Sequence, residues 1–125
     1  MNWETIYRQK VVDAETAVSH IESGNLVYLG GGAGAPAALV DALCLRAADL
    51  RDVQLIHILT FIGAPYIDPK YEGSFRSNSL FIGHNVRKAV QAGNADFTPI
   101  FLSEIPGLFQ KKILPLDAAL ISLSP

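Results

Sequence analysis

The fold of this chain is decided by residues 26–40, which read LVYLGGGAGAPAALV. The four apolar residues Leu26–Leu29 are typical of a buried strand, and an apolar helical pattern begins after Pro36. Four glycines lie between them, within positions 30–34. Pro36 fits the first turn of a helix, because its missing N–H is not needed there. A strand, a glycine turn and a helix in this order predict one unit of an α/β fold.

The rest of the sequence continues the alternation of strands and helices. Asp13 is expected to cap a helix, and Gly24 and Gly93 are expected to follow helix ends. The hydrophobic pattern predicts helices at 14–21, 36–47, 86–92 and from 103 onward, and strands at 25–29, 53–59, 80–82, 95–101 and 118–121. We therefore predict one α/β domain, residues 1–125, with a mostly parallel open sheet and helices on both faces.

Two segments depart from this regular pattern. Residues 60–77 contain several glycines and prolines and are expected to form a long loop, which in a small domain is usually functional or disordered. Pro99 interrupts the strand predicted at 95–101, which suggests an edge strand or a bulge.

The last predicted strand, 118–121, is of a buried type but is followed by no helix. We therefore expect the chain to belong to a larger unit, or to be completed by another chain.

The composition excludes several classes of protein. Half of the 125 residues are hydrophobic and only 18% are charged, which leaves apolar surface for a partner. The net charge is -2 and the basic residues form no stripe, so we expect no nucleic-acid partner. The apolar runs are shorter than the roughly 18 to 20 residues of a membrane span, and the first residues do not resemble a signal peptide. The single cysteine, Cys44, fits a reducing cytoplasm.

The glycine turn has three interpretations. Gly30-x-Gly32-x-x-Ala35 can be aligned with the dinucleotide fingerprint, but the next strand ends at Thr60 without the acidic residue that this fingerprint requires. A phosphate-binding P-loop is disfavoured because no lysine lies nearby. The glycines either permit positive φ angles and close packing, or they expose backbone N–H groups to an anion such as a carboxylate or a thioester oxyanion.

The candidate site follows from where the strands end. In an open α/β sheet the loops after the strands gather at one edge, and ligands bind there. This edge is expected to include residues 30–34, 60–63, 83–85 and 102–104. The substrate-binding candidates are Gly30, Gly31, Gly32, Ala33, Gly34, Thr60, Gly63, His84 and Asn85. We assign no catalytic residue in this chain. We also predict no metal site, because the three histidines are too scattered for a local metal motif.

Other chemically notable residues have structural explanations. His57 alternates with apolar residues in a strand and is expected to be buried and hydrogen-bonded. Cys44 is expected to be inert core, and Trp3, Tyr7 and Phe109 are expected to pack against the domain. Glu104 is expected to interact with a helix dipole. The aromatic residues of the long loop are candidates to cover an apolar ligand or a partner surface: Tyr66, Tyr71 and Phe75.

Several motifs in the second half of the chain identify a family. They are NSLFIG at 78–83, RKAVQAGNADFTP at 87–99, FLSEIP at 101–106 and LPLDAALI at 114–121. Together with residues 3–7, 13–21 and 30–36, they resemble the acetyl-CoA hydrolase/transferase family. The resemblance extends over essentially the whole chain, and the most similar group is the 4-hydroxybutyrate CoA-transferase type.

This resemblance implies a function and a division of labour. Members of the family are larger, with two related α/β domains, and exchange CoA between an acyl-CoA and a carboxylate. A glutamate in the second domain attacks the thioester and forms covalent intermediates. This sequence resembles only the front part of the first domain, so the resemblance leaves open whether it is an enzyme alone. CoA would be a substrate, with no further cofactor.

Two hypotheses therefore stand after the sequence analysis. In the first, the chain is the N-terminal segment of a CoA-transferase or acyl-CoA hydrolase and shapes the acyl and carboxylate pocket. Its partners are then an acyl-CoA, a small carboxylate and possibly a chain carrying the second domain. In the second, it is a stand-alone, non-catalytic module that self-associates as a homo-oligomer or binds an acyl ligand.

Overall fold

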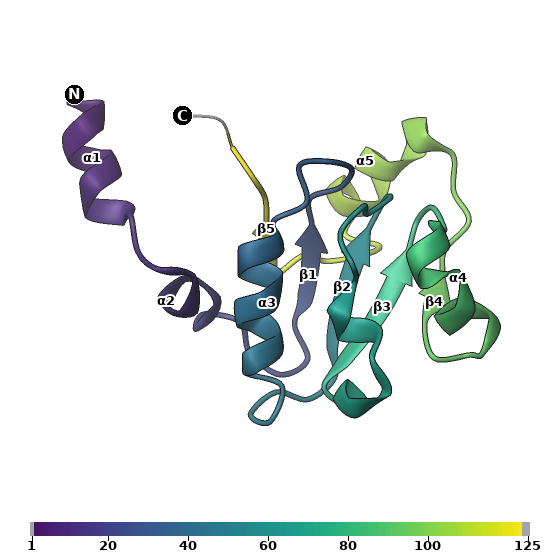
Figure 1. Cartoon of the computed structure of the whole chain (residues 1–125). Coiled ribbons are helices and arrows are strands. Elements are labelled where there is room, and N and C mark those ends of the chain that lie inside the picture. Colours follow the sequence, from purple (N-terminus) through teal and green to yellow (C-terminus); the bar gives the residue numbers. More distant parts are fainter. Residues whose placement is uncertain (1, 124–125) are drawn as a thin grey trace.

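A computed structural model describes residues 2–123 and arranges them around a parallel sheet (Figure 1). Its five strands lie in the order β4-β3-β2-β1-β5, and every neighbouring pair is parallel. The strands are β1 (Leu26–Leu29), β2 (Val53–His57), β3 (Phe75–Ser79), β4 (Asp96–Phe97) and β5 (Ala118–Leu120). The predicted α/β class with a parallel open sheet is confirmed.

Helices connect the strands and extend the chain at its N-terminal end. They are α1 (Trp3–Lys10), α2 (Ala14–Val18), α3 (Ala37–Leu45), α4 (His84–Gln91) and α5 (Ile105–Gln110), with short 3-10 turns η1 (Pro65–Ile67), η2 (Pro69–Tyr71) and η3 (Leu102–Glu104). The predicted cap is confirmed, because the Thr16 amide donates to Asp13 Oδ1 at 2.7 Å. Within residues 2–123, no helix is long and apolar enough to cross a membrane.

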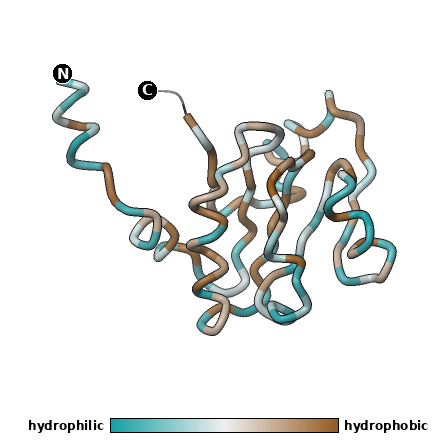
Figure 2. The backbone as a smooth tube through the Cα atoms, in the orientation of Figure 1, coloured by the Kyte–Doolittle hydropathy of each residue, from teal (hydrophilic) through white to brown (hydrophobic). Residues whose placement is uncertain are grey.

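The sheet has an apolar core on each face, as predicted. On one face, side chains of β1, β2 and β3 pack against α2, α3 and η1, with Val27, Leu43 and Leu55 almost fully buried. On the other face, Ile56 and Leu80 pack against Ile105 of α5. The ring of Phe109, also from α5, meets the ring of Tyr28 edge-on at 5.9 Å. The hydrophobic residues of Figure 2 accordingly follow α3, β1 and β2, whereas β3 is polar after Phe75.

The third strand lies five residues earlier than predicted. The sequence indicated a strand at 80–82, but β3 is Phe75–Ser79, which begins inside the predicted loop 60–77 and ends two residues after it. Its residues Ser77 and Ser79 are polar and nevertheless buried, because both hydroxyls lie within hydrogen-bonding distance of the buried His57. The loop aromatics Tyr66 and Phe75 are buried in the core and, with Tyr71, line a cavity, so whether they cover a ligand stays a prediction.

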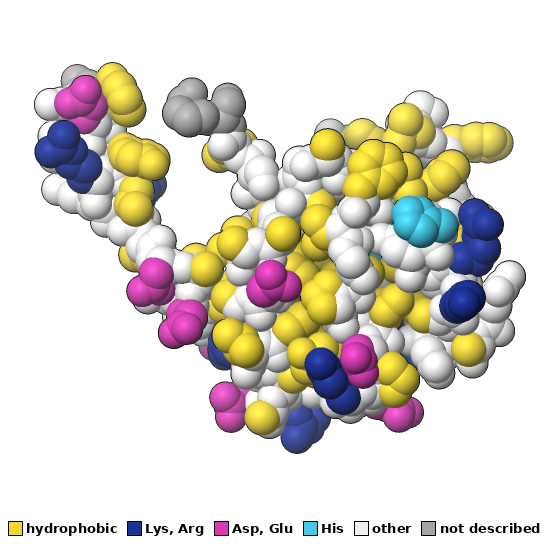
Figure 3. All heavy atoms as spheres, viewed as in Figure 1, with side chains coloured by type: hydrophobic (Ala, Val, Ile, Leu, Met, Phe, Trp, Pro, Cys, Tyr) yellow, Lys and Arg dark blue, Asp and Glu magenta, His cyan; other side chains and the backbone are white. Residues whose placement is uncertain are grey.

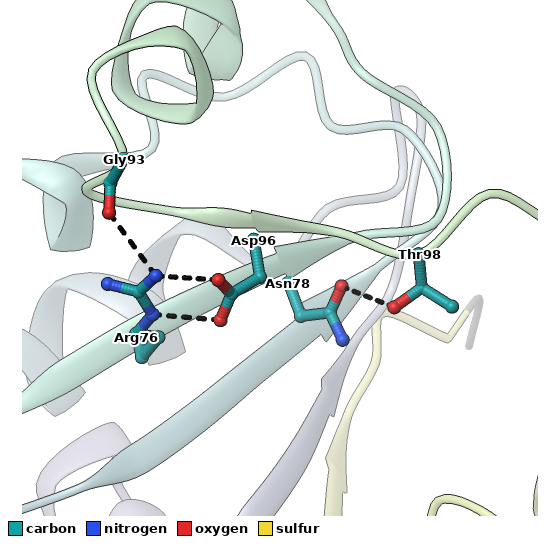
Figure 4. A network of polar contacts seen from close by, with 5 residues as sticks. All are labelled: Arg76, Asn78, Gly93, Asp96 and Thr98. Atoms are coloured by element: carbon teal, nitrogen blue, oxygen red, sulfur yellow. Dashed lines mark hydrogen bonds and ion pairs between the residues drawn. The ribbon is translucent and has the colours of Figure 1, made fainter.

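The fourth strand is shorter than the predicted 95–101 and consists of Asp96–Phe97. Two side-chain contacts hold it to β3 (Figure 4). Asp96 accepts from the Arg76 guanidinium at 2.8 and 2.6 Å, and the Thr98 hydroxyl donates to Asn78 Oδ1 at 2.9 Å. Pro99 has no N–H with which to continue the ladder, which explains why the strand ends before it.

The N-terminal helix was not predicted, and its position corrects another expectation. None of the residues of α1 is buried, and Figure 1 shows the helix standing away from the sheet. Trp3 is 71% exposed and Tyr7 is 63% exposed, so the prediction that they pack against the domain is wrong for the part of the chain described.

Candidate functional site

Three loops meet at the carboxyl ends of the strands, as the α/β topology requires. The Gly32 amide donates to Leu59 O at 2.6 Å, which joins the turn after β1 to the segment after β2. The side-chain amide of Asn85, at the start of α4, donates to Thr60 O at 3.1 Å and to Ile62 O at 2.7 Å. The structure therefore brings the glycine turn, the loop from Thr60 and the start of α4 to one edge of the sheet.

The structure explains why two positions of the turn are glycine. A Cβ at Gly31 would lie 2.8 Å from Leu59 O, so only glycine fits this close approach. Gly32 has a φ of 63°, a conformation that glycine adopts without strain. Gly34 differs from both, since its φ is not positive and the nearest atom to an added Cβ would be 3.8 Å away. Packing and backbone conformation therefore explain Gly31 and Gly32 but not Gly34.

The amides of the turn divide into two groups. Those of Gly30 and Gly32 donate to Leu120 O and Leu59 O, at 2.8 and 2.6 Å. Those of Gly31, Ala33 and Gly34 donate to no acceptor among residues 2–123. Ala33 and Gly34 are also exposed. The anion-binding interpretation consequently narrows from the whole turn to the amides of Gly31, Ala33 and Gly34.

The two helices that begin at this edge lack side-chain caps. α3 starts after Pro36 and α4 after Gly83, and neither residue offers a side-chain acceptor to the first amides of its helix. By contrast, α1 and α2 start elsewhere and are capped by Asn2 and Asp13. Uncapped helix N-termini carry a partial positive charge and free N–H donors, which favour a negatively charged group.

Two buried polar atoms lie at the same edge. Thr60 Oγ1 and Asn85 Oδ1 are shielded from solvent and have no hydrogen-bond partner within the described chain. Asn85 Oδ1 would lie 2.7 Å from a Cβ at position 83, so a side chain there would require the amide group of Asn85 to shift. His84 and Gly63, the remaining candidates, are both exposed. Asn85 is therefore placed to position the 60–62 segment through its amide group.

The other singled-out side chains behave as structural residues. His57 is fully buried, and Nε2 lies 3.2 Å from the Ser77 hydroxyl, which confirms the predicted buried, hydrogen-bonded histidine. Burial lowers its pKa from 6.5 to about 4, so it is neutral at pH 7. Burial also raises the pKa of the Cys44 thiol to about 11, which confirms an unreactive core cysteine. Among residues 2–123, no cluster of three His, Cys, Asp or Glu side chains could hold a metal.

One contributor to this edge escaped the sequence analysis. Leu59 closes the glycine turn through its carbonyl oxygen, the atom that Gly32 N–H contacts and that a Cβ at Gly31 would approach. A backbone carbonyl leaves no signal in residue type, so no sequence pattern could have indicated it. The Asn85 contacts were missed for a different reason, because they depend on how α4 docks against the 60–62 segment.

The comparison with protein families settles where this fold belongs. The model of the acetyl-CoA hydrolase/transferase N-terminal domain matches residues 1–125. The chain belongs to this family. It is 40% identical over 124 residues to 4-hydroxybutyrate coenzyme A transferase of Clostridium kluyveri, and 48% identical over 107 residues to succinyl-CoA:acetate/propanoyl-CoA:succinate CoA transferase of Fasciola hepatica.

These relatives are much longer than the chain. It spans 29% of the length of the Clostridium kluyveri protein and 22% of that from Fasciola hepatica. Solved structures agree with the fold. For 4-hydroxybutyrate CoA-transferase of Porphyromonas gingivalis the TM-score is 0.73, the identity is 26%, and the match covers 96% of this chain and 26% of that one. For RipA of Yersinia pestis the TM-score is 0.86 at 24% identity, covering 100% of this chain and 31% of that one. The predicted partial first domain of a CoA-transferase is thereby confirmed.

Proposed function

We propose that this chain forms one wall of the acyl and carboxylate pocket of a CoA-transferase or acyl-CoA hydrolase. The observation that carries this proposal is the set of free amides in the glycine turn, at Gly31, Ala33 and Gly34. A carboxylate or thioester oxygen accepts hydrogen bonds from such donors. The glycines allow the ligand to approach without an intervening side chain.

The names of the relatives support a carboxylate as the ligand. They describe transfer from succinyl-CoA to cyclohexane-1-carboxylate in a Geobacter metallireducens protein and from butyryl-CoA to acetate in an Anaerostipes caccae protein, at 32% and 28% identity. The acyl chains differ, but each reaction presents a carboxylate or a thioester carbonyl. Backbone amides recognise this shared group without depending on the rest of the acid, which suits a family with varied acids.

The covalent step, in this proposal, belongs to polypeptide outside this chain. Among the candidate residues at the edge, none is a carboxylate. Glu104 lies at the N-cap of α5, where its side chain caps no amide, and it is exposed. A glutamate elsewhere attacks the thioester carbon and releases the CoA thiolate, which leaves an acyl-glutamyl anhydride. The thiolate then attacks the glutamyl carbonyl of this anhydride, which forms a glutamyl-CoA thioester and releases the acyl group as a carboxylate. The amides of this chain hold the oxygen on which negative charge develops.

We also propose that the protein works in the cytoplasm, with acyl-CoA and a small carboxylate as its ligands. The one cysteine is reduced and buried, which is compatible with a reducing compartment. This part of the proposal is tested by fractionating cells that express the tagged protein. Recovery of the protein outside the cytoplasmic fraction would contradict it.

The division of labour is tested by an assay of the isolated chain. Acetyl-CoA and butyrate are incubated with the 125-residue protein, and butyryl-CoA is quantified by chromatography. We expect no product above the protein-free blank, because the chain holds the amides but not the nucleophile. Transfer at enzyme-like rates, on the order of 1 s⁻¹ or faster, would show that the chain contains its own catalytic group.

A further inference from the structure

The N-terminal helix α1 carries an apolar stripe that nothing in the described chain covers. Trp3, Ile6 and Tyr7 recur at the i, i+3, i+4 spacing that places them on one face. Val11 and Val12, which follow the helix, are also more than half exposed. Figure 3 shows the hydrophobic side chains of α1 on the side turned toward the domain, with charged side chains on the opposite side.

An isolated helix of this length needs a surface to pack against. α1 has 8 residues and no buried side chain. Helices shorter than about 12 to 15 residues are marginal in water without tertiary contacts. The Asn2 cap, which accepts from the Glu4 amide at 3.2 Å, adds only a modest stabilisation. The sequence therefore encodes a helix whose apolar face is suited to a partner surface.

A second uncovered feature lies on the same side of the molecule in Figure 1. β5 is an edge strand of a parallel sheet, and it pairs only with β1 among the described strands. Ile121 and Leu123, which follow it, are 48% and 82% exposed. Parallel strands are normally buried on both faces and covered by further elements. One partner surface could cover the apolar face of α1 and this edge together.

The structural comparison indicates what that surface is. The match to RipA covers 100% of this chain, α1 included, at a TM-score of 0.86, but only 31% of the RipA chain. The matched segment of RipA thus includes the residues aligned with α1, within a chain more than three times longer. In such a chain, the remaining polypeptide is available to fill the space beside the helix.

We propose that α1 is a docking arm for the polypeptide that, in the longer relatives, lies outside the matched segment. Trp3, Ile6 and Tyr7 pack on an apolar surface of that polypeptide, and the β5 edge lies against the same body. This arm fixes the position of the matched domain relative to the polypeptide outside the matched segment. The inference rests on family membership and on the exposure of α1, and it does not require the amide–carboxylate contact.

Hydrogen exchange of α1 tests this proposal. The first sample is the 125-residue chain alone, and the second is the same chain joined to the part of the Clostridium kluyveri relative that lies outside the matched 29%. In the chain alone, we expect the amides of residues 3–10 to exchange at nearly the rate of an unfolded peptide. In the joined protein, we expect exchange at least about tenfold slower, because packing on a surface suppresses local opening.

Substitutions on the two faces of α1 provide the matched comparison. Trp3→Ala with Tyr7→Ala removes the two aromatic side chains of the stripe while keeping high helix propensity, and should return exchange in the joined protein to the rate of the chain alone. Thr5→Ala with Gln9→Ala changes the opposite, exposed face and should keep the protection. Loss of protection in both variants would show that the stripe is not the docking surface.

Three further results would overturn the proposal. The first is a joined protein in which the strands are protected but α1 is not. The second is slow exchange of α1 in the monomeric 125-residue chain, which needs no joined protein to measure. The third is a homodimer of that chain, detected by light scattering, whose formation requires Trp3 and Tyr7, because the stripe would then bind a second copy. Because no arm of the experiment contains CoA or a carboxylate, its outcome is independent of the proposed pocket.

Discussion

Gly31 and Gly34 lie three residues apart in the same turn, yet the structure gives them different reasons to be glycine. At Gly31 the backbone of Leu59 approaches so closely that a side chain would collide with its carbonyl oxygen. At Gly34 there is room for a methyl group and no unusual φ. In our account, Gly34 is left small because a ligand approaches its exposed amide.

The first prediction compares alanine at these two positions. Gly31→Ala should lower the free energy of unfolding by roughly 1–3 kcal/mol, because the added Cβ would lie 2.8 Å from Leu59 O. Gly34→Ala should change it by less than about 0.5 kcal/mol. Urea denaturation of the three proteins measures both values. Equal losses at the two positions would contradict the steric explanation.

The second prediction concerns His57 and pH. Its pKa is lowered from 6.5 to about 4 by burial, so on acidification the unfolded state takes up a proton before the folded state does. The stability from the neutral imidazole is therefore complete above pH 6.5 and is lost as the pH falls toward 4. Between these two pH values, the free energy of unfolding should fall by up to ~1.4 kcal/mol for each pH unit.

Urea unfolding between about pH 7 and pH 4.5 measures this slope. His57→Gln should flatten it, since glutamine does not titrate. His20→Gln removes an exposed histidine and should leave the slope as in the unsubstituted protein. A slope that survives His57→Gln would assign the pH dependence to other groups.

At the scale of elements, the sequence predicted most accurately those strands whose side chains are apolar. β1, β2 and β5 lie within the predicted segments, because their buried positions are filled by residues such as Val27, Leu55 and Leu120. β3 was misplaced because its buried positions include Ser77 and Ser79. Their burial depends on His57, which comes from a strand about 20 residues earlier. A pattern based on hydrophobicity does not detect a strand that is buried through cross-strand hydrogen bonds.

The helices show the same limit of local patterns. α2, α3 and α4 lie at the predicted places, because their buried faces repeat at the helical period and residues such as Asp13, Pro36 and Gly93 mark their boundaries. For α1, the sequence contained the apolar stripe but could not say that the stripe would stay exposed instead of packing on this domain. Whether an apolar face is buried in its own domain is a property of the tertiary structure.

The third prediction is made for the β4 edge. Asp96→Asn removes the carboxylate that Arg76 contacts at 2.6 and 2.8 Å (Figure 4) and should free the end of β4. Because both side chains are about half exposed, the expected loss is only about 0.5–1 kcal/mol. Faster exchange of the Thr98 amide, which donates to Ser79 O, measures the local effect.

A weaker ion pair serves as the control for β4. Lys70 Nζ lies 3.7 Å from Asp68 Oδ2, and neither residue belongs to β4. Asp68→Asn should therefore leave exchange at Thr98 unchanged. If both substitutions accelerated exchange at Thr98 equally, the effect would reflect a general loss of stability rather than the Arg76–Asp96 contact.

At the scale of the whole molecule, the sequence predicted the fold class and the edge where the candidate residues gather. The α/β alternation was sufficient for this, because the topology places the ends of parallel strands together. Which amides of the turn are free was beyond sequence reasoning. It depends on the partners of Gly30 and Gly32, namely Leu120 O and Leu59 O, and these belong to other strands and loops.

The most direct test of the central claim is a titration of the ¹⁵N-labelled chain with butyrate, followed by NMR, with the uncharged butyramide as the control. We predict that the largest amide shifts occur at Gly31, Ala33 and Gly34, that Gly30 and Gly32 shift less because their N–H groups are already bonded, and that butyramide produces little change. Shifts that map to the opposite end of the sheet, or that are equally large with butyramide, would contradict the proposal that these free amides receive a carboxylate.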